Sequence, residues 1–251
     1  MIEREARDGV TILRLAHGKA SALDTEFCDA ITRALEESAG DAAPTVLTGS
    51  GSIFSAGVDL KRILDASEDE LAAFLDALDR CFLATLAYPG PLVAAVNGHA
   101  IAGGCILAAA CDHRVMATGK GRIGVPELLV GVPFPSSALE ILRGVLPADR
   151  FREAVLRGGA FLPDEALARG FVQELAEADD LMDRATSIAG ELGAIHPPTF
   201  RLAKEQNIAP VLEQIRRGQE VFDRRVRNSW KSEDTRAAIR GYVERTLGGK
   251  G

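Results

Sequence analysis

The chain has 251 residues, 47% of them hydrophobic and 26% charged, with a net charge of −7 from 29 Lys and Arg against 36 Asp and Glu. This composition is typical of a globular protein with a substantial core, and its acidic balance argues against nucleic-acid binding. The N-terminal residues are charged where a signal peptide is apolar, and no apolar run approaches the roughly 20 residues of a membrane span, so we expect a cytoplasmic protein without a membrane partner.

The first hundred residues predict strands that alternate with helices. Residues 10–15 (VTILRL) predict a strand, and a helix is expected from about Thr25 with Asp24 as its N-cap. Residues 45–49 predict a second strand, and the leucines of residues 69–91 recur at helical spacing. A further strand is expected at residues 92–98. This order of elements is typical of an α/β fold.

The alternation continues to about residue 195. Residues 105–111 predict a helix, residues 113–118 and 121–125 predict strands, and residues 137–146 and 149–158 predict helices. After residue 195 the sequence shows helical periodicity and no strand signal. A tail of this size is too small for a strong core of its own, so it is expected to pack on the main domain or on another subunit.

Neither a disulfide nor a metal site is expected. The cysteines show no CxxC spacing, and the histidines show no spacing typical of metal ligands; these residues are Cys28, Cys81, Cys105, Cys111, His17, His99, His113 and His196. Two turns that contain glycine, residues 48–64 and 96–111, run from a strand into a helix. Neither turn fits the P-loop pattern or the GxGxxG dinucleotide pattern.

Taken together and in order, several segments resemble the enoyl-CoA hydratase/isomerase family, also called the crotonase family. The segments are VLTGSGSIFSAGVDL, PLVAAVNGHAIAGGCILAAACD and IGVPELLVGVPFP, with further matches at GKASALD, LPDEALARGFVQEL and SEDTRAAIRGYVERTL. The resemblance implies a crotonase-like spiral of β-β-α repeats at residues 1–195. It also implies a helical trimerisation region at residues 196–251, and hence a homotrimer or homohexamer.

The resemblance implies an acyl-CoA thioester as substrate, with coenzyme A as part of the substrate and no separate cofactor. The backbone N–H groups of Val58 and Gly103 are then expected to stabilise an enolate-like oxyanion. Such a donor contributes on the order of 10² to 10³ in rate. Gly103 and Gly104 are expected to let the backbone approach the thioester closely.

The acid/base residues of the family are only partly present. Hydratases of the family carry one glutamate at the position of Ile106 and another at the position of Glu127. An isoleucine can neither hold a water nor transfer a proton, so addition of water lacks one of its two groups. Glu127 alone is enough to move a proton from C2 to C4, which favours isomerisation of a 3-enoyl-CoA to a 2-enoyl-CoA. The apolar Ile106 is expected to raise the pKa of Glu127.

Other residues are assigned to substrate binding by the same resemblance. Lys19 is placed near the phosphates of coenzyme A, and Ser55 and Ala56 near its adenine through backbone contacts. Asp59, which follows the oxyanion donor, belongs to the same set. Phe134, where hydratases carry glycine, is expected to reshape the acyl pocket.

Several alternatives stay open at this stage. Trp230 either packs in a subunit interface or lines the substrate entrance. The enzyme could instead be a hydratase with a one-glutamate site, which would be tested by its rate on a 2-enoyl-CoA. Loss of one glutamate is also consistent with a non-catalytic acyl-CoA binder, although a pure binder has no need for Glu127. RNA binding is disfavoured by the acidic charge.

Overall fold

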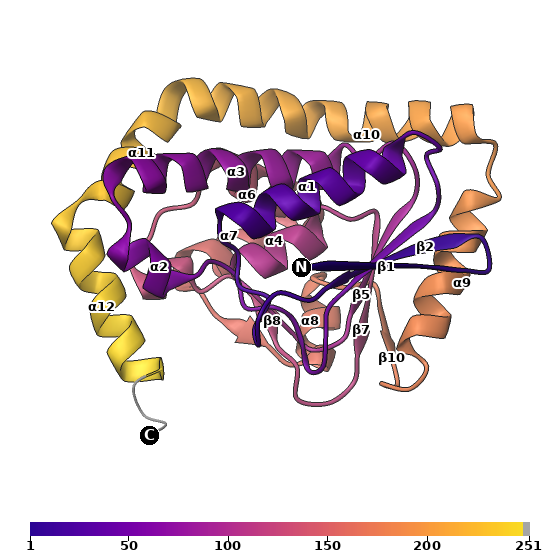
Figure 1. The fold of residues 1–251 in the computed structure, drawn as a ribbon, viewed down its shortest axis with the longest axis horizontal. Helices are drawn as coiled ribbons and strands as arrows, with labels where there is room; N and C mark the ends of the chain where they lie inside the picture. The colour runs from indigo at the N-terminus through magenta and orange to yellow at the C-terminus, as the bar shows by residue number, and fades with distance from the viewer. Residues whose placement is uncertain (248–251) are drawn as a thin grey trace.

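The computed structural model describes residues 1–247, in which two sheets are covered by helices (Figure 1). The strands are β1 (Ile2–Arg7), β2 (Val10–Leu15), β3 (Thr45–Thr48), β4 (Ile53–Ser55), β5 (Leu92–Val96), β6 (His99–Ile101), β7 (His113–Ala117), β8 (Ile123–Gly124), β9 (Ala160–Phe161) and β10 (Glu174–Ala176). The helices are α1 (Thr25–Ala39), α2 (Leu60–Asp65), α3 (Glu68–Leu86), α4 (Gly103–Ala109), α5 (Glu127–Val130), α6 (Ser136–Val145), α7 (Ala148–Arg157), α8 (Pro163–Arg169), α9 (Leu181–Gly193), α10 (Pro197–Gly218), the π-helical turn η1 (Gln219–Asp223), α11 (Arg224–Lys231) and α12 (Glu233–Leu247).

Successive turns of the chain place one strand in each of the two sheets. The larger sheet has the order β1-β2-β3-β5-β7-β10 and the smaller has the order β4-β6-β8-β9. Three pairs of consecutive strands place their first member in the larger sheet and their second in the smaller one: β3 and β4, β5 and β6, and β7 and β8. One or more helices follow each pair. The strands β2, β3, β5, β7 and β10 pair in parallel. The expected α/β spiral of β-β-α turns is confirmed.

The sequence analysis did not predict β1, which lies at the edge of the larger sheet. Five of its six residues are exposed, as expected for an edge strand without an apolar face. It pairs antiparallel with β2 through a two-residue turn at Asp8 and Gly9, both of which have positive φ. An Asp-Gly pair is a strong signal for such a hairpin, so this strand could have been predicted from the turn.

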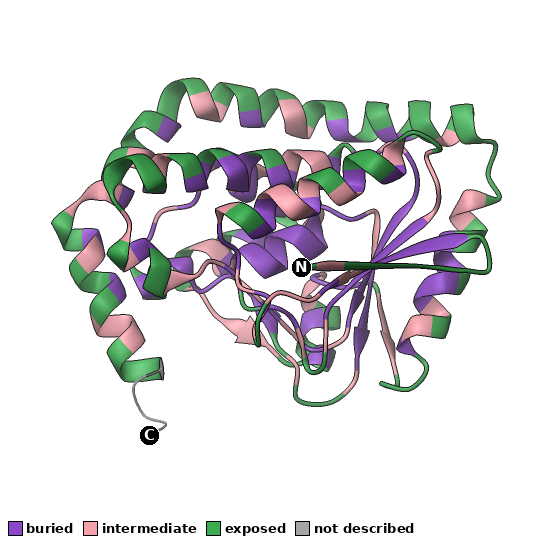
Figure 2. Ribbon diagram, viewed as in Figure 1, coloured by how far each residue is buried: buried purple, intermediate pink, exposed green. Residues whose placement is uncertain are grey.

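The core lies on both faces of the larger sheet. On one face, α1, α3 and α4 form a large apolar cluster with the sheet, and on the other face α9 packs against it. Helix α4 is buried along its whole length, whereas the outer face of α10 is exposed (Figure 2). Asp24 caps α1 as predicted, because its carboxylate accepts a hydrogen bond from the N–H of Phe27 at 2.8 Å. Within residues 1–247, no helix combines the length and apolar character that a membrane span requires.

The tail packs on the main body of the same chain. Helix α10 crosses α6, and its buried Lys204 reaches the turn before β7. The Nζ atom of Lys204 donates to the Asp112 carboxylate at 2.7 Å and to the Gly90 carbonyl at 3.1 Å. Asp112 also accepts a hydrogen bond from the N–H of Leu92 at 2.8 Å. This buried ion pair fixes the tail to the start of β5.

Replacing Lys204 with methionine is expected to lower the free energy of unfolding by about 3 kcal/mol, because it leaves the Asp112 carboxylate without its cation. Arg216→Met on the same helix is the matched control, since Arg216 makes only exposed ion pairs with Glu213 and Glu220. That variant should be nearly as stable as the wild type in urea unfolding. Equal losses in the two variants would contradict the anchoring role of Lys204.

Candidate active site

An apolar cavity of about 90 Å³ lies where α3, α4, α5 and α6 meet the tail helices α11 and α12. Its walls are almost entirely hydrophobic and come from both parts of the chain. The lining residues are Ala56, Val58, Leu60, Leu78, Phe82, Ile101, Ala102, Gly103, Ile106, Pro126, Glu127, Val130, Val132, Pro133, Pro135, Ala138, Trp230 and Tyr242. Glu127 is the only carboxylate among the described residues that line it.

Two backbone segments approach each other closely at one wall of the cavity. A Cβ atom at Gly57 would lie 2.5 Å from the Ile101 carbonyl oxygen and 3.1 Å from the nitrogen of Gly103. Gly57 also has a φ of +79°, a conformation that glycine adopts without strain. Glycine at position 57 is therefore required for the turn after β4 to touch the start of α4.

Val58 and Gly103 lie at this wall, and their backbone N–H groups have no hydrogen-bond partner within residues 1–247. The N–H of Leu23 donates to the Gly57 carbonyl at 2.7 Å, and the Leu23 carbonyl accepts from the N–H of Asp59 at 3.0 Å. The N–H of Val58, which lies between these two residues in the chain, takes no part in this pairing. Gly103 is the first residue of α4, where N–H groups have no partner within the helix. Within residues 1–247 neither group donates a hydrogen bond. Two such donors can together stabilise a negative oxygen.

The residue before Gly103 is held in a strained conformation. Ala102 has φ 52° and ψ −122°, which a residue with a Cβ atom rarely adopts. Its N–H donates to the Gly124 carbonyl at 2.8 Å and its carbonyl accepts from Ile106 at 3.1 Å, so both sides of the residue are fixed. Strain of this kind costs about 1–3 kcal/mol and is concentrated at functional sites. Here it orients the peptide group of Gly103.

Glu127 brings a buried carboxyl group into the cavity. It is the first residue of α5, directly after Pro126, and the turn is closed by hydrogen bonds from Gly131 and Val132 to its carbonyl. Its Oε2 atom is buried and has no hydrogen-bond partner in the described chain. Burial raises the pKa of Glu127 to about 8, the direction expected from its apolar neighbours. The group can therefore exchange a proton near neutral pH.

Ile106 lies in the same cavity, one turn into α4, and is fully buried. It adds apolar surface and no polar atom to the wall. Five residues selected from the sequence thus line one cavity: Ala56, Val58, Gly103, Ile106 and Glu127. Ala56 is exposed at the mouth of the cavity. The N–H of Ala56 donates to the Ala20 carbonyl at 3.0 Å.

The structure does not place the other predicted residues in the cavity wall. The Phe134 ring is 7% exposed and packs in the core, while the flanking Pro133 and Pro135 form the wall. Its effect on the acyl pocket stays a prediction. A Cβ atom at Gly104 would lie 2.3 Å from the Ser55 carbonyl oxygen, so this glycine allows α4 to pack closely against β4. The approach of its backbone to a thioester stays a prediction.

Three further predicted residues lie outside the cavity. Lys19 is exposed on the loop after β2. The Ser55 hydroxyl is buried and donates to the Ser21 carbonyl at 2.7 Å. Asp59 caps α2 by accepting from the N–H groups of Lys61 and Arg62, both at 3.1 Å.

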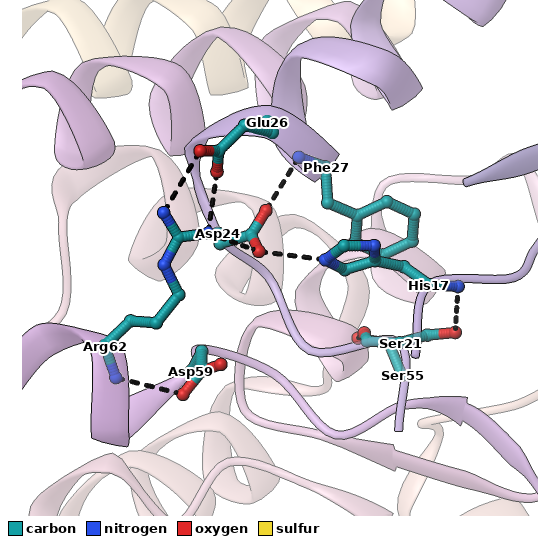
Figure 3. A network of polar contacts seen from close by, with 8 residues as sticks. All are labelled: His17, Ser21, Asp24, Glu26, Phe27, Ser55, Asp59 and Arg62. Atoms are coloured by element: carbon teal, nitrogen blue, oxygen red, sulfur yellow. Dashed lines mark hydrogen bonds and ion pairs between the residues drawn. The ribbon is translucent and has the colours of Figure 1, made fainter. Parts of the chain in front are cut away.

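A polar network holds the segment that carries the Val58 donor (Figure 3). His17 and Arg62 both contact Oδ2 of Asp24, at 2.8 and 2.7 Å, and Arg62 also binds Glu26 at 2.8 Å. Burial would raise the pKa of Asp24, but hydrogen bonds from His17 and the Phe27 N–H outweigh it and hold the pKa below its usual value. Asp24 thus joins α1 and α2 beside Leu23, whose backbone fixes the peptide groups around Val58.

Two aromatic residues of the tail complete the cavity, and the sequence analysis had left one of them undecided. Trp230 is 2% exposed and lines the cavity wall, which agrees with the second of the two expectations for it. Tyr242 of α12 also lines the wall, and nothing in its local pattern indicated this. The strained Ala102 was not predicted either, because its conformation depends on contacts with β8.

Several known proteins resemble this chain over most of its length. A sequence model described as enoyl-CoA hydratase/isomerase matches residues 5–247. A structure of the enoyl-CoA hydratase EchA3 from Mycobacterium ulcerans is 28% identical, with a TM-score of 0.82 over 87% of this chain and 96% of that one. The rat mitochondrial enoyl-CoA delta isomerase 1 is 28% identical over 81% of this chain and 72% of its own length. A structure of the human mitochondrial Δ3-Δ2-enoyl-CoA isomerase has a TM-score of 0.93 at 24% identity, covering 100% of this chain and 99% of that one, which shows the same fold.

The polar network predicts how Asp24 variants affect stability. Asp24→Asn keeps a good helix cap but removes the charge that faces Arg62, whereas Asp24→Ala removes both and should cost about 1 kcal/mol more in urea unfolding. Asp29→Asn, on the same helix, is the control. The exposed Asp29 carboxylate pairs with Arg80, so its loss should leave the stability nearly unchanged.

The stability contributed by the Asp24 charge depends on pH. Since folding lowers the pKa of Asp24, its charge stabilises the protein above the unfolded pKa, and this stabilisation is lost as the pH falls through the folded pKa. A gap between wild type and Asp24→Asn that widens as the pH falls would contradict this account.

Proposed function

The chain belongs to the enoyl-CoA hydratase/isomerase family, and from this premise we propose that it is an enoyl-CoA isomerase that converts a 3-enoyl-CoA to a 2-enoyl-CoA. The observation that carries the proposal is the single carboxylate of the cavity. Glu127 lies in a wall shared with the free N–H groups of Val58 and Gly103, and Ile106 occupies the place where a second carboxylate would be needed for hydration.

The proposed reaction uses these three groups in one proton transfer. The thioester oxygen accepts hydrogen bonds from the N–H groups of Val58 and Gly103. The Glu127 carboxylate removes a proton from C2, the electrons of that C–H bond move toward the thioester oxygen, and an enolate forms that is stabilised by the two donors. The protonated Glu127 then returns the proton to C4, the double bond settles between C2 and C3, and the carboxylate is regenerated.

Coenzyme A enters this proposal as part of the substrate, with no separate cofactor. Its phosphates are assigned to the exposed Lys19, which can reach an anion at the surface. The adenine is assigned to the backbone of Ser55 and Ala56. Because the N–H of Ala56 is occupied by Ala20, the contacts there must come from carbonyl oxygens and from shape.

A homotrimer or homohexamer in the cytoplasm is the assembly we propose. Large apolar side chains are exposed on the tail, with Val221 and Phe222 more than half accessible in the single chain. Such residues at neighbouring positions are typical of a surface that is covered by a partner. Light scattering of the purified protein at micromolar concentration gives the stoichiometry directly.

The first test is a paired assay on 3-hexenoyl-CoA and 2-hexenoyl-CoA. We expect isomerisation of the first without hydration of the second. Glu127→Gln should lose isomerisation by about 10³-fold, because it removes the group that moves the proton. Cys105→Ala, a change at a buried neighbour outside the cavity wall, serves as the control for packing near the site.

Other outcomes of the paired assay would indicate a different function. Rapid hydration of 2-hexenoyl-CoA would identify a hydratase that positions its water with one glutamate. Tight binding of both substrates without turnover would identify a non-catalytic acyl-CoA binder. An active Glu127→Gln variant would overturn the assignment of Glu127 as the acid/base group.

The raised pKa of Glu127 predicts opposite trends for activity and stability. The base must be ionised, so kcat/KM should rise about tenfold per pH unit below pH 8 and level off above it. In the unfolded chain Glu127 ionises near pH 4.5, whereas in the folded protein it stays protonated up to about pH 8. The unfolded state therefore binds fewer protons between these two pH values. As the pH rises from 4.5 to about 8, the free energy of unfolding of the wild type should fall relative to that of Glu127→Gln. A pH profile with an apparent pKa near 4.5, or parallel stability curves, would contradict the burial of this carboxyl group.

A further inference from the structure

The side of the cavity formed by the tail depends on one fixed aromatic side chain. Trp230 is buried, and its indole N–H donates to the carbonyl oxygen of Pro133 at 3.1 Å. Pro133 is itself part of the cavity wall. The hydrogen bond satisfies the only polar atom of the indole and fixes the plane of the ring, so that the ring presents a rigid apolar face to the cavity.

Ionic contacts hold the helix of Trp230 against the body of the protein. Arg227, one turn before Trp230, binds Asp76 of α3 at 2.7 Å and lies 3.5 Å from Asp79. Lys231, the next residue after Trp230, binds Glu68 at the start of α3 at 3.2 Å. The Trp230 ring is therefore bracketed by two cations that attach α11 to the same helix.

The beginning of α12 is fixed in a similar way. The Arg236 guanidinium donates to the Leu64 and Ala66 carbonyl oxygens, both at 2.9 Å, where α2 ends. These contacts place the tail helices over α2 and α3 with the cavity between them. A longer ligand would have to break several of these contacts to displace Trp230.

The size and chemistry of the cavity limit the group that it can hold. Its volume of about 90 Å³ is far below the roughly 300–1,000 Å³ of pockets for drug-sized ligands. Apart from Glu127, the Tyr242 hydroxyl and the indole N–H already bound to Pro133, its lining side chains are apolar. A hydroxyl or charged group on the chain would lose water there without gaining enough partners.

We propose that the acyl part of the substrate is a short, unsubstituted chain of about four to six carbons, and that Trp230 sets this upper limit. The proposal deepens the function given above and rests on it for the identity of the thioester. The cavity takes the first carbons of the chain beside Glu127, and the indole face stops it. Removing the indole opens space into which further methylene groups can extend.

The test measures binding without turnover, so that it does not depend on the reaction. Saturated butanoyl-CoA, hexanoyl-CoA and decanoyl-CoA are titrated into the full chain by calorimetry. Decanoyl-CoA should bind the wild type at least about tenfold more weakly than hexanoyl-CoA, since extra methylene groups would overpack a cavity without room for them. In Trp230→Ala the ratio of the two affinities should shift toward decanoyl-CoA by about tenfold or more, and in Trp230→Phe by less.

A control separates the size of the cavity from loosening of the helix. Val226 is half-buried on α11 and packs against the core, but it is outside the cavity wall. Val226→Ala should leave the ratio of affinities as in the wild type. If this variant favours decanoyl-CoA as strongly as Trp230→Ala does, a loosened helix and not the indole sets the limit, and the assignment to Trp230 is overturned.

Fluorescence supplies a second readout that remains useful even if Trp230→Ala fails to fold. The chain contains one tryptophan, so its emission reports on this position alone. Hexanoyl-CoA should change the emission of the wild type, whereas coenzyme A without an acyl group should change it much less. Equal responses to the two ligands, or decanoyl-CoA binding as tightly as hexanoyl-CoA in the wild type, would overturn the inference.

The binding series also separates the chain-length limit from the proposed reaction. A protein that shows the expected binding series but does not isomerise 3-hexenoyl-CoA would refute the proposed reaction without contradicting the chain-length limit.

Discussion

The contact between the turn after β4 and the start of α4 is the constraint on which the site depends. Two backbones can approach this closely only because Gly57 has no side chain and adopts a positive φ. The contact brings together two N–H groups, at Val58 and Gly103, that come from successive turns of the spiral and donate no hydrogen bond within the described residues. The network around Asp24 on one side and the strained Ala102 on the other fix the two peptide groups independently. The two peptide groups are therefore held by contacts within the chain itself, which is what the proposed stabilisation of an oxyanion requires.

Glu127 shows the cost of such a site to the folded protein. Its Oε2 atom is buried without a partner, and burial keeps the carboxyl group protonated over much of the neutral range. A polar neighbour at position 106 would relieve this cost, but the isoleucine there leaves the group poorly solvated. The same feature that reduces stability at neutral pH brings the pKa close to the value at which a proton is exchanged most efficiently. Stability and proton transfer are thus opposed at one residue.

Most of the fold and part of the site could be predicted from the sequence. The helices α1, α3, α6 and α7 follow from apolar periodicity, and the spiral follows from the resemblance of several segments in order. The strand β1 was missed because its burial pattern has no apolar face, although Asp8-Gly9 carried a hairpin signal. The packing contacts of Phe134 and Gly104 could not be predicted, because a sequence position next to a wall does not reveal which neighbours a residue touches. Ala102 and Tyr242 could not be found, since both depend on contacts between distant parts of the chain.

The spiral before residue 195 and the tail after it build one cavity together. The spiral supplies the backbone donors and the carboxyl group, and the tail supplies Trp230 and Tyr242 to the same cavity. The tail has little core of its own, and it is held by the buried Lys204 at one end and by Arg227, Lys231 and Arg236 at the other. Exposed ion pairs contribute little to stability individually, but here they act together across one surface. Apolar residues of the tail, among them Ile208, Ile215 and Ile239, are also buried in the main core cluster. Since the tail completes the cavity and is held by both apolar and ionic contacts, the size of the cavity and the docking of the tail are governed by the same contacts.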